Sequence, residues 1–186
     1  MSQNCCSPVD TAQNEVSKIE NCCAPALAGN GAKVATPQTN LCRACGQKGK
    51  KVDSITLKAM LDVSLLVLRD VPYLFCRTAD CPMVYFAADE LQSFTKDQIR
   101  VPVYQKEPGD ESVPVCYCFH HSPATIWAEL WATGQSTVVE EIEGGIKSGQ
   151  CACEVRNPQG SCCLGNVRAV VKRVRNELGA PATSTL

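Results

Sequence analysis

The sequence has little aromatic surface and no long hydrophobic run, and each absence limits what the chain can be. Only 5% of its 186 residues are aromatic, which predicts small hydrophobic cores. The longest apolar run, residues 63–68, is broken by Ser64, whereas a membrane-spanning helix needs about 20 apolar residues. The first residues are polar, unlike the charged and then apolar start of a secretion signal. We therefore expect a cytoplasmic chain without membrane insertion.

An excess of charge of one sign is also missing. The chain has 18 basic and 19 acidic residues and a formal net charge of −1. Two metal centres with four thiolates each would lower this charge to about −5. Nucleic-acid binding depends on neutralising phosphates with basic residues, so we expect no nucleic-acid partner. No arrangement for hydrolysis or group transfer is evident, and we do not expect conventional enzyme turnover.

Cysteine, in contrast, is abundant, with 14 residues. Since cytoplasmic thiols are kept reduced, closely spaced cysteines there indicate metal or redox sites more than disulfides. Two cysteine pairs have short spacings of two and four residues, and a short turn presents two sulfurs to one metal ion. The spacing predicts a structural zinc site with the ligands Cys42, Cys45, Cys76 and Cys81. The alternative is four buried cysteines without a metal.

A second group of cysteines has a different pattern. Cys116-x-Cys118 is followed after 34 residues by Cys153, and then by the vicinal pair Cys162-Cys163. The pattern resembles the bacterioferritin-associated ferredoxin type of [2Fe–2S] domain, in which a Cys-x-Cys motif and a later cysteine pair flank two helices. The last spacing is longer here than in that ferredoxin. A helix starting just after Cys118 would direct its N-terminal amides toward an anionic cluster.

From about residue 41 to residue 165 the chain resembles the N-terminal domain of CopZ-type copper chaperones, which joins a zinc site to a [2Fe–2S] cluster. The motifs that carry the resemblance are Leu41-Cys42-Arg43-Ala44-Cys45-Gly46, Thr56 to Leu61, Phe75-Cys76, Cys81 to Phe86, Pro114 to Phe119, and Cys153 to Cys163. The resemblance implies that the cluster is held by Cys116, Cys118, Cys153 and Cys163. Cys162 is the alternative to Cys163, and Cys151 is a weaker substitute for Cys153. The partner expected is a metal-transport protein such as a copper-exporting ATPase, or a redox partner.

The first 40 residues contain few large apolar side chains. Such a segment cannot bury enough surface to offset its ordering entropy, so we expect a disordered tail. An Asn-Cys-Cys-x-Pro unit occurs twice in it, and vicinal thiols suit Cu(I) or another thiophilic ion. The candidate soft-metal ligands are therefore Cys5, Cys6, Cys22 and Cys23. The alternative is an incidental cysteine-rich tail.

The fold predicted is α+β, with a disordered N-terminal tail at 1–40, a small zinc-ribbon-like β domain at 41–105 and a small helical [2Fe–2S] domain at 115–180. Ser122 is a good N-cap residue and Pro123 suits the first helical position. We expect helices at 56–61, from residue 123, at 137–146 and at 167–178. We expect strands at 73–75, 83–86 and 99–104, the last confined to a sheet edge by its proline. Trp127 and Trp131 are expected in the helical core.

Together these features predict an iron–sulfur and zinc protein of heavy-metal homeostasis, with copper as the expected metal. One-electron redox at a [2Fe–2S] cluster would be combined with soft-metal binding by the tail thiols. Two alternatives remain: a simple ferredoxin-like electron carrier, and a redox-inactive zinc or soft-metal buffer or sensor.

Overall fold

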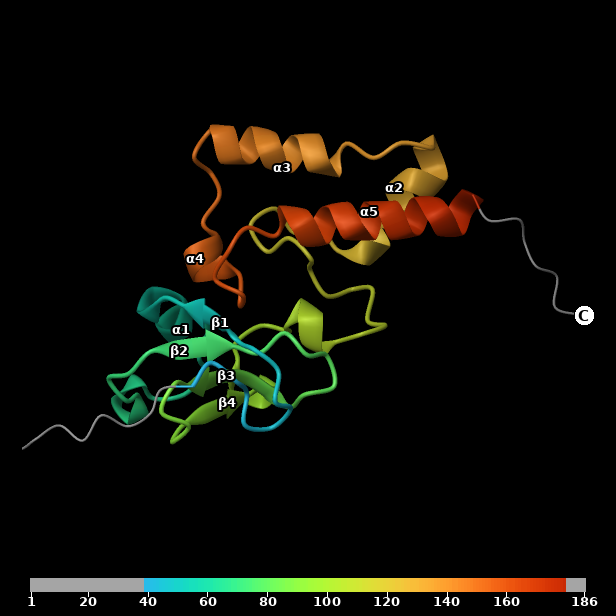
Figure 1. Ribbon diagram of the computed structural model, residues 1–186. Coiled ribbons are helices and arrows are strands. Elements are labelled where there is room, and N and C mark those ends of the chain that lie inside the picture. Colours follow the sequence, from blue (N-terminus) through green and yellow to red (C-terminus); the bar gives the residue numbers. More distant parts are fainter. Residues whose placement is uncertain (1–38, 180–186) are drawn as a thin grey trace, which may run out of the picture. The chain divides into compact units, whose positions relative to one another are not determined.

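The computed structural model describes residues 39–179, which combine an antiparallel sheet with a group of helices (Figure 1). The predicted tail cysteines Cys5, Cys6, Cys22 and Cys23 lie outside the described residues. Residues 39–179 belong to one compact unit. The predicted domain boundaries near residues 105 and 115 stay predictions. In this part of the chain no helix combines the length and apolar character that a membrane crossing requires.

The sheet has four short antiparallel strands in the order β1-β2-β3-β4. The strands are β1 (Lys50–Val52), β2 (Tyr73–Phe75), β3 (Met83–Ala87) and β4 (Ser93–Thr95). The predicted strands at 73–75 and 83–86 are confirmed. The two edge strands were not predicted, because each has three residues and they read Lys-Lys-Val and Ser-Phe-Thr, too short to show an alternating pattern.

The strand predicted at 99–104 is wrong. Ile99 forms only an isolated bridge with Leu61, and Pro102 has no N–H to donate to a ladder. The segment instead runs beside the end of helix α1 (Ser54–Met60), where Arg100 N–H donates to Met60 O at 2.9 Å. It then enters a 3₁₀ turn, η3 (Tyr104–Lys106). Two further 3₁₀ turns are η1 (Leu65–Val67) and η2 (Lys96–Gln98).

Helix α1 packs on the sheet, as its apolar positions predict. Leu57 and Met60 are buried in a core that also contains Phe75, Tyr85 and Phe94. A second cluster, with Leu74 and Phe86, surrounds the first group of cysteines. The sheet thus contributes to two clusters: one is the core that contains α1, and the other contains the predicted zinc ligands.

The second half of the chain is helical. Its helices are α2 (Pro123–Thr133), α3 (Val138–Lys147), α4 (Cys153–Arg156) and α5 (Leu164–Gly179). Ser122 Oγ accepts from Thr125 N–H at 3.2 Å, which confirms the predicted N-cap. Helices α2 and α3 both pack on α5, and α3 and α5 lie side by side in Figure 1. The helix predicted at 167–178 lies within α5, and its residues Val167, Val170, Val171 and Val174 are buried.

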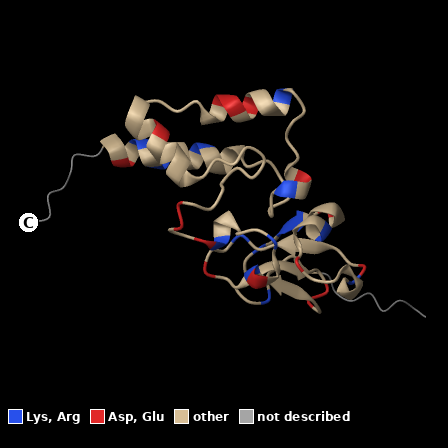
Figure 2. Ribbon diagram, turned by 180° about the vertical axis from the view of Figure 1, so that it is seen from behind, with Lys and Arg blue, Asp and Glu red and all other residues tan. Residues whose placement is uncertain are grey.

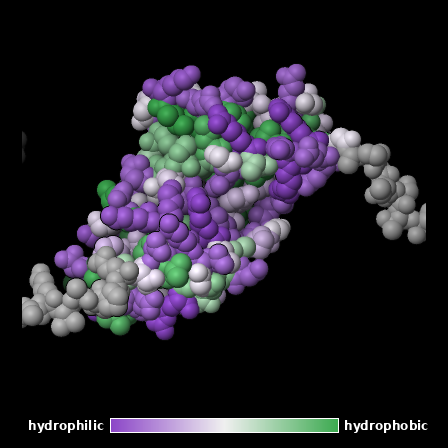
Figure 3. Space-filling view, viewed as in Figure 1, coloured by the Kyte–Doolittle hydropathy of each residue, from purple (hydrophilic) through white to green (hydrophobic). Residues whose placement is uncertain are grey.

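The expectation that both tryptophans lie in the core is wrong. Trp131 is 74% exposed and Trp127 is 37% exposed, whereas Ile126 and Leu130 are buried. Adjacent helical positions are rotated by about 100°, so the column of Ile126 and Leu130 can face α5 while the next column faces outward. Figure 3 shows further apolar surface over α3 and the start of α5, between polar side chains.

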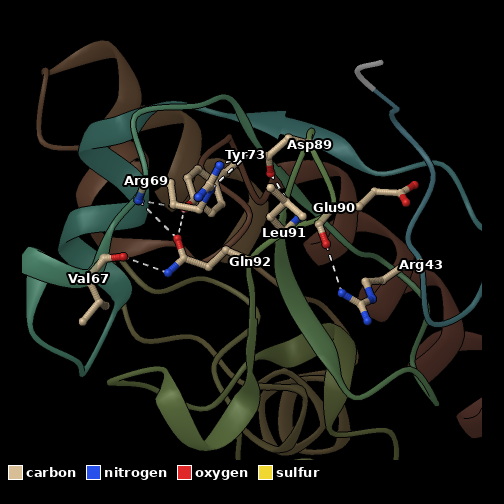
Figure 4. A network of polar contacts seen from close by, with 8 residues as sticks. All are labelled: Arg43, Val67, Arg69, Tyr73, Asp89, Glu90, Leu91 and Gln92. Atoms are coloured by element: carbon tan, nitrogen blue, oxygen red, sulfur yellow. Dashed lines mark hydrogen bonds and ion pairs between the residues drawn. The ribbon is translucent and has the colours of Figure 1, made fainter. Parts of the chain in front are cut away.

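A polar network holds the turn between β3 and β4 (Figure 4). Arg69 forms an ion pair with Asp89 at 2.8 Å, and Gln92 Nε2 donates to Val67 O at 2.9 Å. Arg43, between the cysteines of the first pair, donates to Glu90 O at 3.0 Å. The turn therefore anchors the loop that carries the first two candidate zinc ligands.

Basic and acidic residues both occur in many parts of the described chain (Figure 2). Acidic residues are concentrated on α3, at Glu140, Glu141 and Glu143, and basic residues on α5, at Arg168, Lys172, Arg173 and Arg175. Basic side chains lie on β1 and α1, at Lys50, Lys51 and Lys58.

Candidate metal centres

The structure brings the first four predicted site residues together. The Sγ atoms of Cys42 and Cys81 lie 3.7 Å apart, as do those of Cys45 and Cys76. All four sulfurs lie within 4.8 Å of one another. A tetrahedral zinc ion with bonds of about 2.3 Å places its sulfurs about 3.8 Å apart. The four thiols therefore fit a zinc ion.

Two tight turns create this arrangement. In the first, Gly46 N–H donates to Cys42 O at 2.7 Å, and Gly46 has a φ of +70° that favours glycine. In the second, Cys76 follows β2 and Cys81 N–H donates to Thr78 O at 3.2 Å. Each turn is local in sequence, which explains why spacing alone predicted the group.

The thiols of this group differ in acidity. A hydrogen bond with Thr78 lowers the pKa of Cys45 to about 6. Burial raises the pKa of Cys81 to about 12 and also raises the pKa of Cys42. A metal ion bound here must displace the protons of the last two thiols, so its binding strengthens as the pH rises.

A buried lysine supports the second turn. Lys106 Nζ donates to Thr78 O at 2.6 Å and to Cys81 O at 3.1 Å, and the residue is only 5% exposed. A zinc ion with four thiolates carries a charge of about −2, which the ammonium group partly offsets. This role was not predicted, because lysine is rarely buried and residue 106 lies between the two predicted domains.

Replacing Lys106 with methionine keeps most of the side-chain volume but removes both charged hydrogen bonds. We expect Lys106→Met to lower the unfolding free energy of the zinc-loaded protein by about 2–4 kcal/mol. Urea unfolding followed by circular dichroism measures the change. The matched control is Lys96→Met, because Lys96 pairs with Glu107 on the surface and should change the value by less than about 0.5 kcal/mol. Equal effects of the two variants would contradict the role of Lys106.

The second group contains five close thiols. Cys118 Sγ lies 3.8 Å from Cys153 Sγ, and Cys163 forms thiol contacts with Cys116 and Cys153. Cys151 Sγ lies 3.3 Å from Cys153 Sγ and 3.9 Å from Cys118 Sγ. The structure thus gathers all four residues of the predicted cluster set and adds Cys151.

Cys162 does not share this position. It is exposed, and its sulfur accepts a hydrogen bond from Leu164 N–H at 3.5 Å. Its neighbour Cys163 is buried beside the other thiols. The geometry therefore favours Cys163 over its predicted alternative.

Hydrogen bonds among the thiols of the second group shift their pKa values in opposite directions. The contact with Cys163 lowers the pKa of Cys116 to about 7 and that of Cys153 to about 5. The same contacts raise the pKa of Cys163. Burial raises the pKa of Cys118. Buried thiolates this close need protons or metal cations between them, and the iron ions of a [2Fe–2S] cluster are bound by four such thiolates.

Backbone amides are directed at the second group. Ala152 N–H donates to Cys118 Sγ at 3.4 Å. This amide immediately precedes α4, whereas the amide predicted for this role belonged to the first turn of α2. Helix α2 begins only at Pro123, five residues after Cys118.

The loop before Cys163 rests on the first half of the chain. Tyr85 Oη donates to Pro158 O at 2.5 Å, and Lys50 Nζ donates to Ser161 Oγ. Gly160 fits closely against Thr56, since a Cβ at Gly160 would lie 2.9 Å from Thr56 Oγ1. The loop that carries a candidate cluster ligand is therefore positioned by the sheet and α1.

Three consecutive residues of η3 connect the two centres. Lys106 contacts the turn before Cys81, as described above. Gln105 Nε2 donates to Gln159 Oε1 at 2.7 Å, and Gln159 Nε2 donates to Cys162 O at 3.0 Å. Tyr104 N–H donates to Tyr117 Oη at 2.9 Å, and Tyr117 lies between two candidate cluster ligands. A displacement of η3 would thus reach both groups of thiols.

Comparison with known proteins agrees with this arrangement. Residues 39–100, which include all four thiols of the first group, match the family model of the CopZ zinc-binding domain. The fold is similar to the X-ray structure of the Archaeoglobus fulgidus CopZ N-terminal domain, at 28% sequence identity and a TM-score of 0.58. That match covers 76% of this chain and 99% of the archaeal domain. A search of curated proteins finds no match. The predicted resemblance to CopZ-type proteins is confirmed for the zinc-binding domain and for the fold.

Proposed function

We propose that this chain binds one zinc ion and one [2Fe–2S] cluster and serves heavy-metal homeostasis, with copper as the metal handled. The proposed zinc ligands are Cys42, Cys45, Cys76 and Cys81. The proposed cluster ligands are Cys116, Cys118, Cys153 and Cys163. The observation that carries the proposal is the presence of two separate groups of thiols, one with four close sulfurs and one in which Cys116 and Cys163 adjoin the close set of Cys118, Cys151 and Cys153, in a chain whose fold is similar to a CopZ N-terminal domain.

The first centre is proposed to be structural. Its four thiols are all candidate ligands of one ion, and three of them are buried. A tetrahedral ion with four protein ligands has no open position for a substrate. Zinc here would stabilise the sheet and hold the loop that supports the second centre.

The second centre is proposed to carry the redox function. When bound, a [2Fe–2S] cluster supplies one-electron redox chemistry. Cys116 and Cys163 would hold its buried end, whereas Cys118 is half-buried and lies toward the surface. The cluster would therefore be accessible to an electron-transfer partner on the side of Cys118. The proposed partner is a metal-transport protein such as a copper-exporting ATPase, or a redox protein of the cytoplasm. The tail thiols are proposed to bind Cu(I) or another soft ion.

A second candidate function is a redox-inactive buffer or sensor of soft metal ions. The observation in its favour is that Cys118, Cys151 and Cys153 form a compact set of three thiols within 4.8 Å of one another. Three thiolates can bind a single thiophilic ion.

An anaerobic reductive titration separates the two candidates. The first predicts that the reconstituted protein takes up about one electron per chain and that its visible absorbance bleaches in the same titration. The second predicts no electron uptake after reconstitution with iron and sulfide, and that result would exclude the redox function.

A further inference from the structure

The second centre has one thiol more than a [2Fe–2S] cluster requires. Four cysteines complete the ligand set of such a cluster, yet five sulfurs meet here. The extra residue, Cys151, precedes α4 and is half-buried. Its sulfur lies 3.3 Å from that of Cys153. Cys162, the other spare cysteine near the site, has no such position.

The distances make Cys151 equivalent to Cys153 with respect to a third thiol. Cys118 Sγ lies 3.8 Å from Cys153 Sγ and 3.9 Å from Cys151 Sγ. Both values match the spacing of about 3.8 Å between two sulfurs on one tetrahedral ion with bonds of about 2.3 Å. Either cysteine can therefore share a metal ion with Cys118 without a large movement of the backbone.

The local chain also permits the exchange. Cys151 and Cys153 are separated only by Ala152, whose N–H is already bonded to Cys118 Sγ. Gly149, two residues before Cys151, has a φ of +71°, so the loop turns sharply just ahead of the two thiols. Both cysteines are thus held on the same side as Cys118 by one short segment.

We infer that Cys151 is a reserve ligand of the cluster, able to replace Cys153 on iron by thiolate exchange. This inference rests on the proposed function, since it requires a cluster at this centre. In the exchange an iron–sulfur bond to Cys153 breaks and one to Cys151 forms. The Cys151 thiol releases its proton and the departing Cys153 thiolate takes one up, so no electron is gained or lost. A cluster near the surface can then survive loss of one thiolate to an oxidant or a soft metal ion.

The test compares cysteine-to-alanine variants after anaerobic reconstitution with iron and sulfide. Cys153→Ala is expected to keep the iron and sulfide content of the wild type, with a shifted visible spectrum. Cys151→Ala is expected to leave both the content and the spectrum unchanged. The double variant Cys151→Ala/Cys153→Ala is expected to lose the cluster. The matched control Cys153→Ala/Cys162→Ala should behave as Cys153→Ala does.

Three results would overturn the inference: a Cys153→Ala variant without iron, a double variant that keeps its cluster, or loss of the cluster in the matched control alone. Zinc content reports whether each variant is folded. Alkylation with iodoacetamide provides a second measurement on the loaded protein. Cys151 should be labelled in the wild type and protected in Cys153→Ala, and labelling of Cys151 in both would contradict the inference. A wild type that binds no iron would instead refute the proposed function itself.

Discussion

Replacing Cys76 with serine is expected to remove the zinc ion and, with it, the visible absorbance of the second centre. Cys76 is buried and its sulfur is 3.7 Å from that of Cys45, so the variant lacks one of four candidate ligands. Small domains with few large side chains draw much of their folding free energy from a structural metal. Loss of zinc should therefore loosen the sheet.

The second centre is expected to lose its cluster as well, because the loop that carries Cys163 is positioned by the sheet. The hydrogen bond from Tyr85 to Pro158 O and the close fit of Gly160 against Thr56 both need β3 and α1 in place. Gln105 and Lys106 in η3 add a second connection between the two centres. Without this support, Cys163 is no longer held beside Cys116, and the cluster loses a defined set of four ligands.

Zinc and iron analysis together with the visible spectrum measures this dependence. The control is Cys162→Ser, which removes an exposed thiol outside both groups and should keep both metals. A Cys76→Ser protein without zinc but with the full absorbance of the wild type would contradict the coupling.

Replacing Cys116 with serine is expected to have a one-sided effect: the visible absorbance is lost and the zinc ion is kept. Cys116 is fully buried and belongs to the helical core with Val115 and Ile126. A smaller and harder oxygen at this position is a poor iron ligand in a thiolate site. The sheet, however, has its own core around Phe75 and Tyr85, and none of its thiols contacts Cys116.

The zinc content of Cys116→Ser per chain should therefore equal that of the wild type, while iron and sulfide fall to background. Far-UV circular dichroism checks that the helices remain. Loss of zinc in this variant would show that the core of the sheet is not sufficient to hold the first group of thiols, which would contradict this prediction.

The sequence predicted the features that depend on local spacing. The two turns of the first centre each lie within a few residues, so cysteine spacing was sufficient to identify the group. Helix α2 was predicted from its N-cap residue, and the predicted helix at 167–178 lies within α5, where buried valines recur at helical spacing. The pattern around Ser122 and Val167 is decided by neighbours along the chain, and its prediction is confirmed.

Features that depend on distant segments could not be predicted. Strands β1 and β4 are strands only because β2 and β3 lie beside them, and Trp131 is exposed because Leu130 already fills the contact with α5. Lys106 is buried because two carbonyls of a turn 25 or more residues earlier meet its ammonium group. Cys151 lies beside Cys118 because α2 and α3, which separate the two residues in the chain, fold back and return the loop before α4 to Cys118. Cysteine spacing alone does not predict this contact.

The two groups of thiols are proposed to bind different metal centres. Iron, sulfide and zinc analysis of anaerobically purified protein, together with its visible spectrum, tests this proposal. We expect a red-brown protein with about two iron, two sulfide and one zinc per chain. A colourless protein with about two zinc per chain, which takes up no iron on reconstitution, would contradict it.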